Sequence, residues 1–207
     1  MKGKGILTVV SGFSGAGKGT LMKNLMSKYS DKYALSISAT TRNPRPGEEH
    51  GREYFFISKE EFEKMIANDE LIEYAKYVEN YYGTPKDYVM TQLEAGKDVI
   101  LEIEVQGALQ IKEKYPETLL LFVTPPNAEE LKNRLVNRGS ETMEVINSRM
   151  ARAAKEAEIM DKYDYLVVND DLDMCTKKMH EIIQSYSNRT SLNASFINEI
   201  KEELKNN

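Results

Sequence analysis

The sequence predicts an α/β fold in which a parallel sheet carries helices on both faces. Four short runs rich in apolar and β-branched residues, at positions 6–10, 98–103, 118–123 and 165–168, indicate strands that are buried on both faces. Segments with helical spacing lie between these runs, and such alternation is typical of parallel α/β sheets. The length of 207 residues favours a single domain, residues 1–207, with a sizeable core.

The segments between the strands carry helix signals. Ser58 and Glu61 have the spacing of a capping box, and Asn127 is placed to cap a later helix. Thr84 followed by Pro85 is a helix-start signature, with the threonine as the cap and the proline at the first helical position. We therefore expect helices over residues 20–28, 59–68, 85–95, 106–114, 127–137, 141–162 and 171–205.

Two stretches depart from the alternation and divide the expected domain. Residues 34–85 contain a bend rich in proline and glycine and less regular, strand-like segments, which predicts an inserted subdomain. Residues 125–160 carry many charges and few apolar side chains, which predicts a mobile lid. The remaining core comprises residues 1–33, 86–124 and 161–207. The segment after about residue 187 leaves two alternatives, a packed helix or self-association as a homodimer.

Charge and composition exclude several classes of function. The formal net charge of −5 argues against a large nucleic-acid-binding surface. There is no apolar run long enough to span a membrane and no secretory signal at the start, so we expect a cytoplasmic protein. The single cysteine, Cys175, cannot form an internal disulfide, and it is expected to be a buried, unreactive thiol.

A glycine-rich segment between the first strand and the first helix predicts a phosphate site. Residues 12–20, GFSGAGKGT, contain the pattern G-x-x-x-x-G-K in the strand–loop–helix context that this motif requires. Glycines let backbone N–H groups turn inward around an anion, and the helix N-terminus adds partial positive charge. Lys18 can reach the β- and γ-phosphates of a nucleotide. Gly19 replaces the usual serine or threonine and Thr20 comes one position late, so metal ligation by Thr20 stays open.

Two arginines in residues 36–47 indicate a second anion site. Arg42 and Arg45 flank a proline in a stiff turn, and guanidinium groups pair bidentately with a phosphate monoester. Tyr54 and Tyr82 could add hydroxyl donors. On these residues alone, a solvated basic turn remains the alternative.

Six motifs, in this order, resemble the guanylate kinase family. They read SGFSGAGKGT, SATTRNPRPGEEHGREYFF, IEYAKYVENYYGTP, LEIEVQG, NRLVNRGSET and YLVVND, and they span about residues 5–185. The resemblance implies a P-loop kinase with a core, a GMP-binding subdomain and a lid, in agreement with the two interruptions. It implies transfer of the γ-phosphoryl group of ATP to GMP and to dGMP, in purine nucleotide metabolism, with Mg²⁺ bound to ATP.

The resemblance and the P-loop together assign roles to individual residues. The positions expected to spread the charge of the transferring group are Lys18, Arg42, Arg138 and Arg149. The expected ATP-binding positions are Ser14, Gly15, Ala16, Gly17, Lys18, Gly19, Thr20, Arg134 and Asn169. The expected GMP-binding positions are Ser38, Arg42, Arg45, Tyr54, Glu73, Tyr82, Thr84 and Glu104. The candidate metal positions are Thr20 and Glu102, the latter through water.

Base recognition follows from hydrogen-bond chemistry. Guanine offers N1–H and N2–H₂ donors, which a carboxylate such as Glu73 accepts, and an O6 acceptor, which the Thr84 hydroxyl serves. Adenine leaves these groups unpaired, and such mismatches can cost about 10⁴–10⁵ in selectivity. Alternatively, Thr84 caps its helix and Glu73 is an ordinary exposed carboxylate. Glu104 departs from the aspartate that the family often has, so its carboxyl extends one bond farther.

The reaction needs positioning rather than proton transfer, because the acceptor phosphate oxygen is already ionised at pH 7. This agrees with a sequence that has no obvious catalytic histidine. Three alternatives remain open. Adenylate kinase shares the GKGT form but is disfavoured by Glu73 with Thr84. A phosphopeptide-binding scaffold is disfavoured by the intact Lys18 and the lid arginines, and a P-loop GTPase by the absence of an NKxD motif.

Overall fold

The computed structural model describes residues 4–77, 79–137, 139 and 142–206, and its centre is a five-stranded sheet. The strands are ordered β2–β7–β1–β8–β9, and all their pairings are parallel. They are β1 (Leu7–Gly12), β2 (Tyr33–Leu35), β7 (Asp98–Glu102), β8 (Leu119–Thr124) and β9 (Tyr165–Val168). The predicted parallel α/β sheet is confirmed, with β2 as one strand that the apolar runs did not indicate. The prediction that residues 165–168 form a fully buried strand is wrong, because β9 lies at the edge of the sheet and only Val167 in it is buried.

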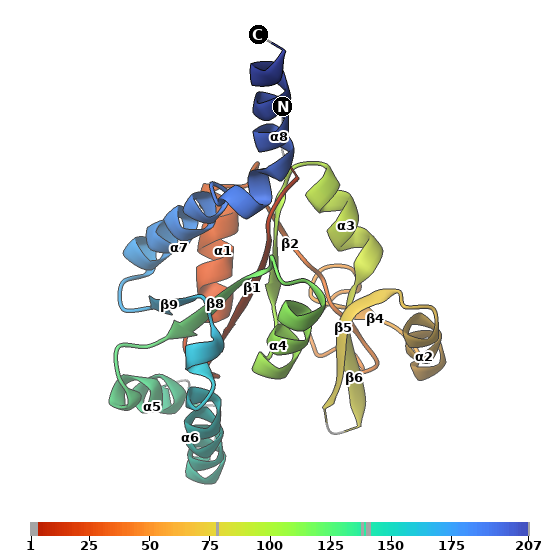
Figure 1. Cartoon of the computed structure of the whole chain (residues 1–207). Coiled ribbons are helices and arrows are strands. Elements are labelled where there is room, and N and C mark those ends of the chain that lie inside the picture. Colours follow the sequence, from red (N-terminus) through yellow and green to blue (C-terminus); the bar gives the residue numbers. More distant parts are fainter. Residues whose placement is uncertain (1–3, 78, 138, 140–141, 207) are drawn as a thin grey trace.

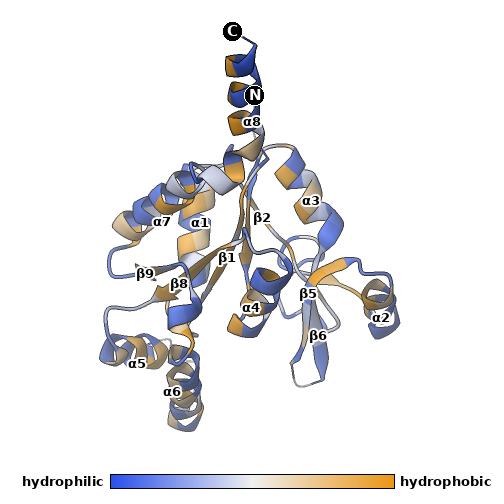
Figure 2. Cartoon of the chain, viewed as in Figure 1, coloured by the Kyte–Doolittle hydropathy of each residue, from blue (hydrophilic) through white to orange (hydrophobic). Residues whose placement is uncertain are grey.

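Helices cover both faces of this sheet (Figure 1). On one face α1 (Lys18–Lys28) packs against α7 (Leu172–Tyr186), and on the other lie α3 (Lys86–Glu94) and α4 (Val105–Lys114). Figure 2 shows hydrophobic colours along the central strands, whose side chains are buried between the helices. Each fully buried aliphatic side chain contributes about 1.5–3 kcal/mol. This burial explains why the central strands read as apolar runs.

A second sheet lies beside the core, in the order β4–β3–β6–β5. Its strands are β3 (Ala39–Thr40), β4 (Phe55–Phe56), β5 (Leu71–Tyr77) and β6 (Asn80–Pro85). α2 (Lys59–Ala67) begins at the predicted Ser58–Glu61 capping box and covers this sheet. The ring of Phe62 on α2 stacks on Tyr81, with centroids 5.1 Å apart. The sheet falls within residues 34–85, and the subdomain boundaries there remain a prediction.

Two helices follow the central strand β8 and lie near the carboxyl edge of the sheet (Figure 1). They are α5 (Ala128–Asn137) and α6 (Met143–Ala157), and they contact each other. Asn127 Oδ1 accepts a hydrogen bond from the Glu130 N–H at 2.8 Å, so its predicted capping role is confirmed. A short 3-10 turn, η1 (Met160–Lys162), then leads into β9. That this stretch moves as a lid remains a prediction.

The predicted start of α3 is wrong. Thr84 lies in β6 and does not cap the helix, which begins at Lys86 after Pro85. The Thr84 hydroxyl instead donates to the carboxylate of Glu73 at 2.7 Å. Proline disfavours helical geometry in the residue before it, and Thr84 is extended in β6 with its side chain directed to the neighbouring strand.

The helical stretch predicted over residues 171–205 is confirmed for most of its length, but the chain turns in its middle and forms two α-helices instead of one. A 3-10 turn, η2 (Thr190–Asn193), separates α7 from α8 (Ala194–Lys205). Asn193 Nδ2 donates to two preceding carbonyl groups, each at 2.8 Å, and this stabilises the turn. α8 projects from the body of the molecule and has no buried residue (Figure 1). It is therefore helical but not packed on the core.

Two expectations from composition can be compared with the structure. Cys175 is buried, and burial raises the pKa of its thiol to about 11, as expected for an unreactive cysteine. Over the described ranges, no helix combines the length and the apolar content that a membrane crossing requires.

Candidate functional site

The P-loop lies at the carboxyl edge of the parallel sheet, between β1 and α1. Gly12 has a φ of 149° and Gly17 a φ of 88°. A Cβ atom at Gly12 would lie 2.1 Å from the carbonyl oxygen of Val123, and one at Gly17 would lie 2.6 Å from Nδ2 of Asn169. Both the backbone conformation and the close neighbours therefore require glycine at these two positions.

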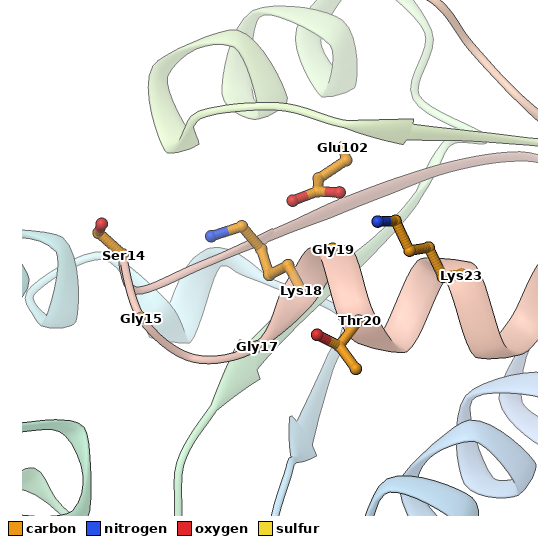
Figure 3. A pocket seen from close by; sticks show the side chains of 8 residues that line it. All are labelled: Ser14, Gly15, Gly17, Lys18, Gly19, Thr20, Lys23 and Glu102. Atoms are coloured by element: carbon orange, nitrogen blue, oxygen red, sulfur yellow. The ribbon is translucent and has the colours of Figure 1, made fainter. Parts of the chain in front are cut away.

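The loop borders a cavity of about 320 Å³ (Figure 3). Its lining residues are Ser14, Gly15, Gly17, Lys18, Gly19, Thr20, Lys23 and Glu102. Figure 3 shows Lys18 and Lys23 on the side of α1 that faces Glu102, whereas Thr20 projects from the opposite side. Two ammonium groups and the N-terminal turn of α1 make this lining suited to phosphate. The sequence analysis missed Lys23, which lies one helical turn after Gly19.

Lys18 is held over the loop by backbone carbonyls. Its Nζ donates to the carbonyl oxygen of Gly12 at 2.7 Å and to that of Phe13 at 3.2 Å. Burial lowers the pKa of this ammonium group, while the nearby carboxylates of Glu102 and Glu104 oppose the shift. The loop therefore holds a partly desolvated cation beside the cavity before any phosphate arrives.

Two other residues predicted to bind ATP, Arg134 and Asn169, form hydrogen bonds to the backbone of the P-loop. The Ala16 carbonyl accepts hydrogen bonds from Asn169 Nδ2 at 2.8 Å and from Arg134 Nη1 at 3.4 Å. Arg134 Nη2 also donates to the Asn169 carbonyl at 2.9 Å. On the other side of the loop, Arg149 Nη1 donates to Ser14 Oγ at 3.3 Å. The structure thus brings α5, α6 and the end of β9 onto the loop.

One predicted phosphate contact, Arg138, lies outside the described residues, so its position in the site stays a prediction.

Both candidate metal positions, Glu102 and Thr20, line the cavity, and Glu102 lies on the side of α1 that carries Lys18. Glu102 ends β7, in register with Val10 of β1, and it lines the cavity. Loss of hydration there raises the pKa of its carboxyl group, and Lys18 opposes this shift. Among the described residues there is no cluster of three acidic, histidine or cysteine side chains that could hold a metal alone. One carboxylate suits Mg²⁺, which usually keeps several waters and binds substrate phosphates.

The predicted phosphate residues of the second sheet form an aromatic and basic cluster. Arg42 lies with its guanidinium 5.4 Å from the ring centroid of Tyr54, and the Tyr54 ring lies 6.1 Å from that of Tyr82. Arg42 Nη2 pairs with Glu48 Oε2 at 2.9 Å, and the two side chains are 15% and 18% exposed. A freely solvated Arg42 is therefore excluded. Glu48 was missed by the sequence analysis.

Glu48 also fixes the turn that carries Arg45. The Arg45 N–H donates to Glu48 Oε2 at 2.8 Å. This hydrogen bond first, and then the Arg42 guanidinium, lowers the pKa of the Glu48 carboxyl group. Ser38 lies just before β3, and its carbonyl accepts a hydrogen bond from the Phe55 N–H at 2.9 Å. The acidic residue three positions after Arg45 is the local signal that could have indicated this contact.

Glu73 is buried, so the alternative of an ordinary exposed carboxylate is wrong. Glu73 is 8% exposed, and its Oε1 accepts the hydroxyl hydrogen bond of the fully buried Thr84. A Cβ atom at Gly107 would lie 2.9 Å from Glu73 Oε2, so the first turn of α4 closes over the carboxyl group. Burial raises the pKa of Glu73 to about 7, although the Thr84 hydrogen bonds act in the opposite direction. Gly107 was not indicated by the sequence analysis.

Glu104 meets the predicted lid. It directly precedes α4, and its carboxylate forms an ion pair with Arg152 of α6. Arg152 Nε also donates to Glu156 Oε1 at 2.8 Å, and Glu156 is 7% exposed. The sequence analysis gave no role to Arg152 or Glu156, because no local pattern links positions 48 residues apart.

Known proteins resemble this chain over most of its length. The family model described as "Guanylate kinase" matches residues 4–186. A guanylate kinase of Clostridioides difficile is 52% identical over 202 residues, which are 97% of this chain and 98% of that protein. A guanylate kinase of Bacillus subtilis is 52% identical over 183 residues, which are 88% and 90% of the two chains.

A solved structure resembles the fold as well. The crystal structure of guanylate kinase from Anaplasma phagocytophilum aligns with a TM-score of 0.73 at 30% sequence identity, and the alignment covers 91% of this chain and 89% of that one. The family match includes the P-loop, both sheets and the helices α5 and α6.

Proposed function

This chain belongs to the guanylate kinase family and phosphorylates GMP to GDP with ATP as the donor, and we propose how the described residues divide that work. The observation that carries the proposal is the buried Glu73–Thr84 pair on one sheet, together with a P-loop cavity on the other. The chain is an enzyme, so the scaffold alternative is set aside. Adenylate kinase and GTPase activities are set aside by the same relatives.

On the donor side, the proposal assigns the ATP phosphates to the loop and its lysine. Backbone N–H groups of residues 14–20 would surround the phosphates, and Lys18 Nζ would leave its two loop carbonyls partly or wholly to reach them. Arg134 and Asn169 hold the loop and lie where the adenosine would approach it. Arg149 would exchange its contact with Ser14 for a phosphate oxygen.

On the acceptor side, GMP would lie against the second sheet. Its phosphate would be bound by Ser38, Arg42, Arg45, Tyr54 and Tyr82. The Arg42 guanidinium would be shared with or released by Glu48, which holds it in this structure. The guanine N1–H and N2–H₂ groups would donate to Glu73, and the Thr84 hydroxyl would turn to serve O6. Glu104 would accept from the same edge of the base.

The chemical step forms one phosphorus–oxygen bond and breaks another. A phosphate oxygen of GMP attacks the γ-phosphorus of ATP, and the bond to the β,γ-bridging oxygen breaks, so ADP leaves. No proton has to be removed, because the second ionisation of a phosphate monoester has a pKa of about 6. We assign the stabilisation of the spreading negative charge to Lys18, Arg42, Arg149 and Arg138.

Magnesium is the expected cofactor, and Glu102 is the residue proposed to act on it through water. Glu102 lines the phosphate cavity on the side of Lys18, which supports this role. Thr20 projects from the other side of α1, which favours contact with a nucleotide phosphate over metal ligation. Bound with ATP, the cation would neutralise part of the negative charge of the phosphates.

Recognition of GMP is expected to weaken as pH falls through the pKa of Glu73. Burial raises that pKa to about 7, so below this pH the neutral carboxyl group predominates and cannot accept from both guanine donors. The value of kcat/KM for GMP should fall about tenfold per pH unit below the pKa and level off above about pH 8. Glu73→Gln is the matched control, since the GMP phosphate titrates equally in both proteins. Identical profiles for the two proteins would contradict this assignment.

An acceptor panel tests the proposed assignment of the base. We expect kcat/KM for GMP to exceed that for AMP by at least about 10³-fold, because adenine leaves the buried carboxylate without its donors. UMP should be equally poor, and dGMP should be used, since no assigned residue reads the 2′-hydroxyl. Turnover of AMP at a rate close to that of GMP would remove Glu73 from its proposed role.

A cytoplasmic location and a homodimer remain predictions. The oligomeric state can be tested by analytical ultracentrifugation.

A further inference from the structure

Arg152 connects the predicted lid to one of the two carboxylates proposed to read guanine. It lies on α6, and its Nη2 pairs with Glu104 Oε2 at the start of α4. Its Nε is held at the same time by Glu156, four residues later on the same helix, at 2.8 Å. The Arg152 side chain is 40% exposed and that of Glu104 is 70% exposed. A ligand can therefore reach the Arg152–Glu104 ion pair and take the place of Arg152 at Glu104.

The chemistry of the two partners suggests what would replace it. A guanidinium group presents planar N–H donors to a carboxylate. The N1–H and N2–H₂ edge of guanine presents neighbouring N–H donors in one plane in the same way. We propose that Arg152 occupies Glu104 in the absence of substrate and competes with the guanine edge of GMP for it. This inference rests on the proposed role of Glu104 in base recognition.

The competition for Glu104 also affects the ATP site, because α6 carries a residue that contacts the P-loop. When guanine takes Glu104, Arg152 keeps Glu156 as a partner on its own helix, so no buried charge is left alone. The tie between α6 and the start of α4 is then broken. α6 also carries Arg149, which contacts Ser14 of the P-loop. Release of α6 by GMP thus allows Arg149 to move relative to the ATP phosphates, and Arg152 acts as a positioning residue that links the two sites.

The strength of this competition is bounded by solvent. Ion pairs that are this exposed contribute little, and their removal changes an equilibrium by a factor of about five at most. A moderate effect on GMP binding is therefore expected, rather than an on–off switch.

Isothermal titration of GMP in the absence of ATP tests the proposal. Arg152→Gln should lower the Kd for GMP by about two- to fivefold, because the competitor is removed. Lys155→Gln, which removes the same charge from an exposed position on the same helix, should leave the Kd unchanged. In a Glu104→Gln background, Arg152→Gln should have no further effect. This double-mutant cycle distinguishes competition at Glu104 from a structural role of Arg152.

Three results would overturn the proposal. One is an unchanged or higher Kd for Arg152→Gln, and another is the same gain in affinity in the Glu104→Gln background. The third is a Glu104→Gln protein that binds GMP like the wild type, which would remove the proposed role of Glu104 together with the competition. If Glu104→Gln weakens GMP binding while Arg152→Gln changes nothing, only the competition fails and the proposed function stands.

Discussion

Replacing Lys18 by methionine is expected to lower kcat/KM by about 10³-fold. The loss of one preorganised donor to a developing negative charge typically costs 10²–10³-fold, and Lys18 also carries a full positive charge. Methionine keeps the length and the apolar stem of lysine, so the loop carbonyls that now accept from Nζ can turn to water. A coupled assay of ADP release with saturating GMP measures the effect.

A stability measurement separates this loss from misfolding. Burial lowers the pKa of Lys18, which means that folding disfavours its charged form. The Lys18→Met protein should therefore unfold at the same temperature as the wild type or higher. Lys23→Met is a useful comparison, because Lys23 lines the same cavity but is not held by the loop carbonyls. A loss of tenfold or less is expected there. Near-normal turnover by Lys18→Met would refute the proposed phosphate site.

Glu73→Gln is expected to reduce kcat/KM for GMP by about 10²–10³-fold. Glutamine is isosteric but places an amide N–H₂ against the N1–H or N2–H₂ of guanine, so a buried donor faces a donor. The Thr84 hydroxyl can still donate to the remaining amide oxygen, and the fold should be kept. Steady-state assays with GMP and AMP measure the effect. The preference for GMP over AMP should shrink by a similar factor.

The KM for ATP identifies where the Glu73→Gln defect lies. Glu73 belongs to the second sheet and does not line the P-loop cavity, so the KM for ATP should stay within about twofold of the wild-type value. Thr84→Ala is the partner variant. It removes the hydroxyl proposed for O6, and Glu73 keeps only the backbone hydrogen bond from residue 84, so a smaller loss is expected. A Glu73→Gln protein that kept full selectivity for GMP would contradict the assignment.

The central sheet was predictable because burial imposes a simple pattern. Strands β1, β7 and β8 lie inside the sheet, and their apolar runs stand out from the polar helix surfaces. β9 was found from its apolar and β-branched residues, although it is an edge strand and only Val167 in it is buried. β2 (Tyr33–Leu35) was missed because it has only three residues and contains no β-branched side chain. β3, β4 and β6 are short or lie in a thin sheet with one small core cluster, so their sequences carry no long apolar run.

Errors in the predicted elements came from side chains whose hydrogen-bond partners the local sequence pattern does not specify. Thr84 has the local features of a helix cap, and its actual partner Glu73 lies 11 residues earlier on a neighbouring strand. The break between α7 and α8 depends on Asn193 binding carbonyls of the preceding turn. Local patterns describe neither contact, because the same residue types favour caps and turns equally.

The candidate site also contains residues that the sequence could predict and residues that only the tertiary structure reveals. The P-loop could be predicted from sequence because its chemistry is contiguous, and Gly12 and Gly17 are required by their backbone conformation. The residues that hold the functional groups in place were not indicated. Glu48 fixes Arg42, Gly107 closes over Glu73, and Arg152 reaches Glu104. The last two contacts form only when α4 and α6 pack, so they belong to the tertiary structure.

The central claim is that a buried acidic pocket on the second sheet selects guanine while nearby arginines hold the acceptor phosphate. A crystal structure of the protein with GMP bound tests it most directly. The guanine N1 and N2 atoms should lie within about 3 Å of the Glu73 carboxylate oxygens, with the phosphate at Arg42 and Arg45. A GMP base bound away from Glu73, or a GMP phosphate bound in the Lys18 cavity alone, would contradict the account.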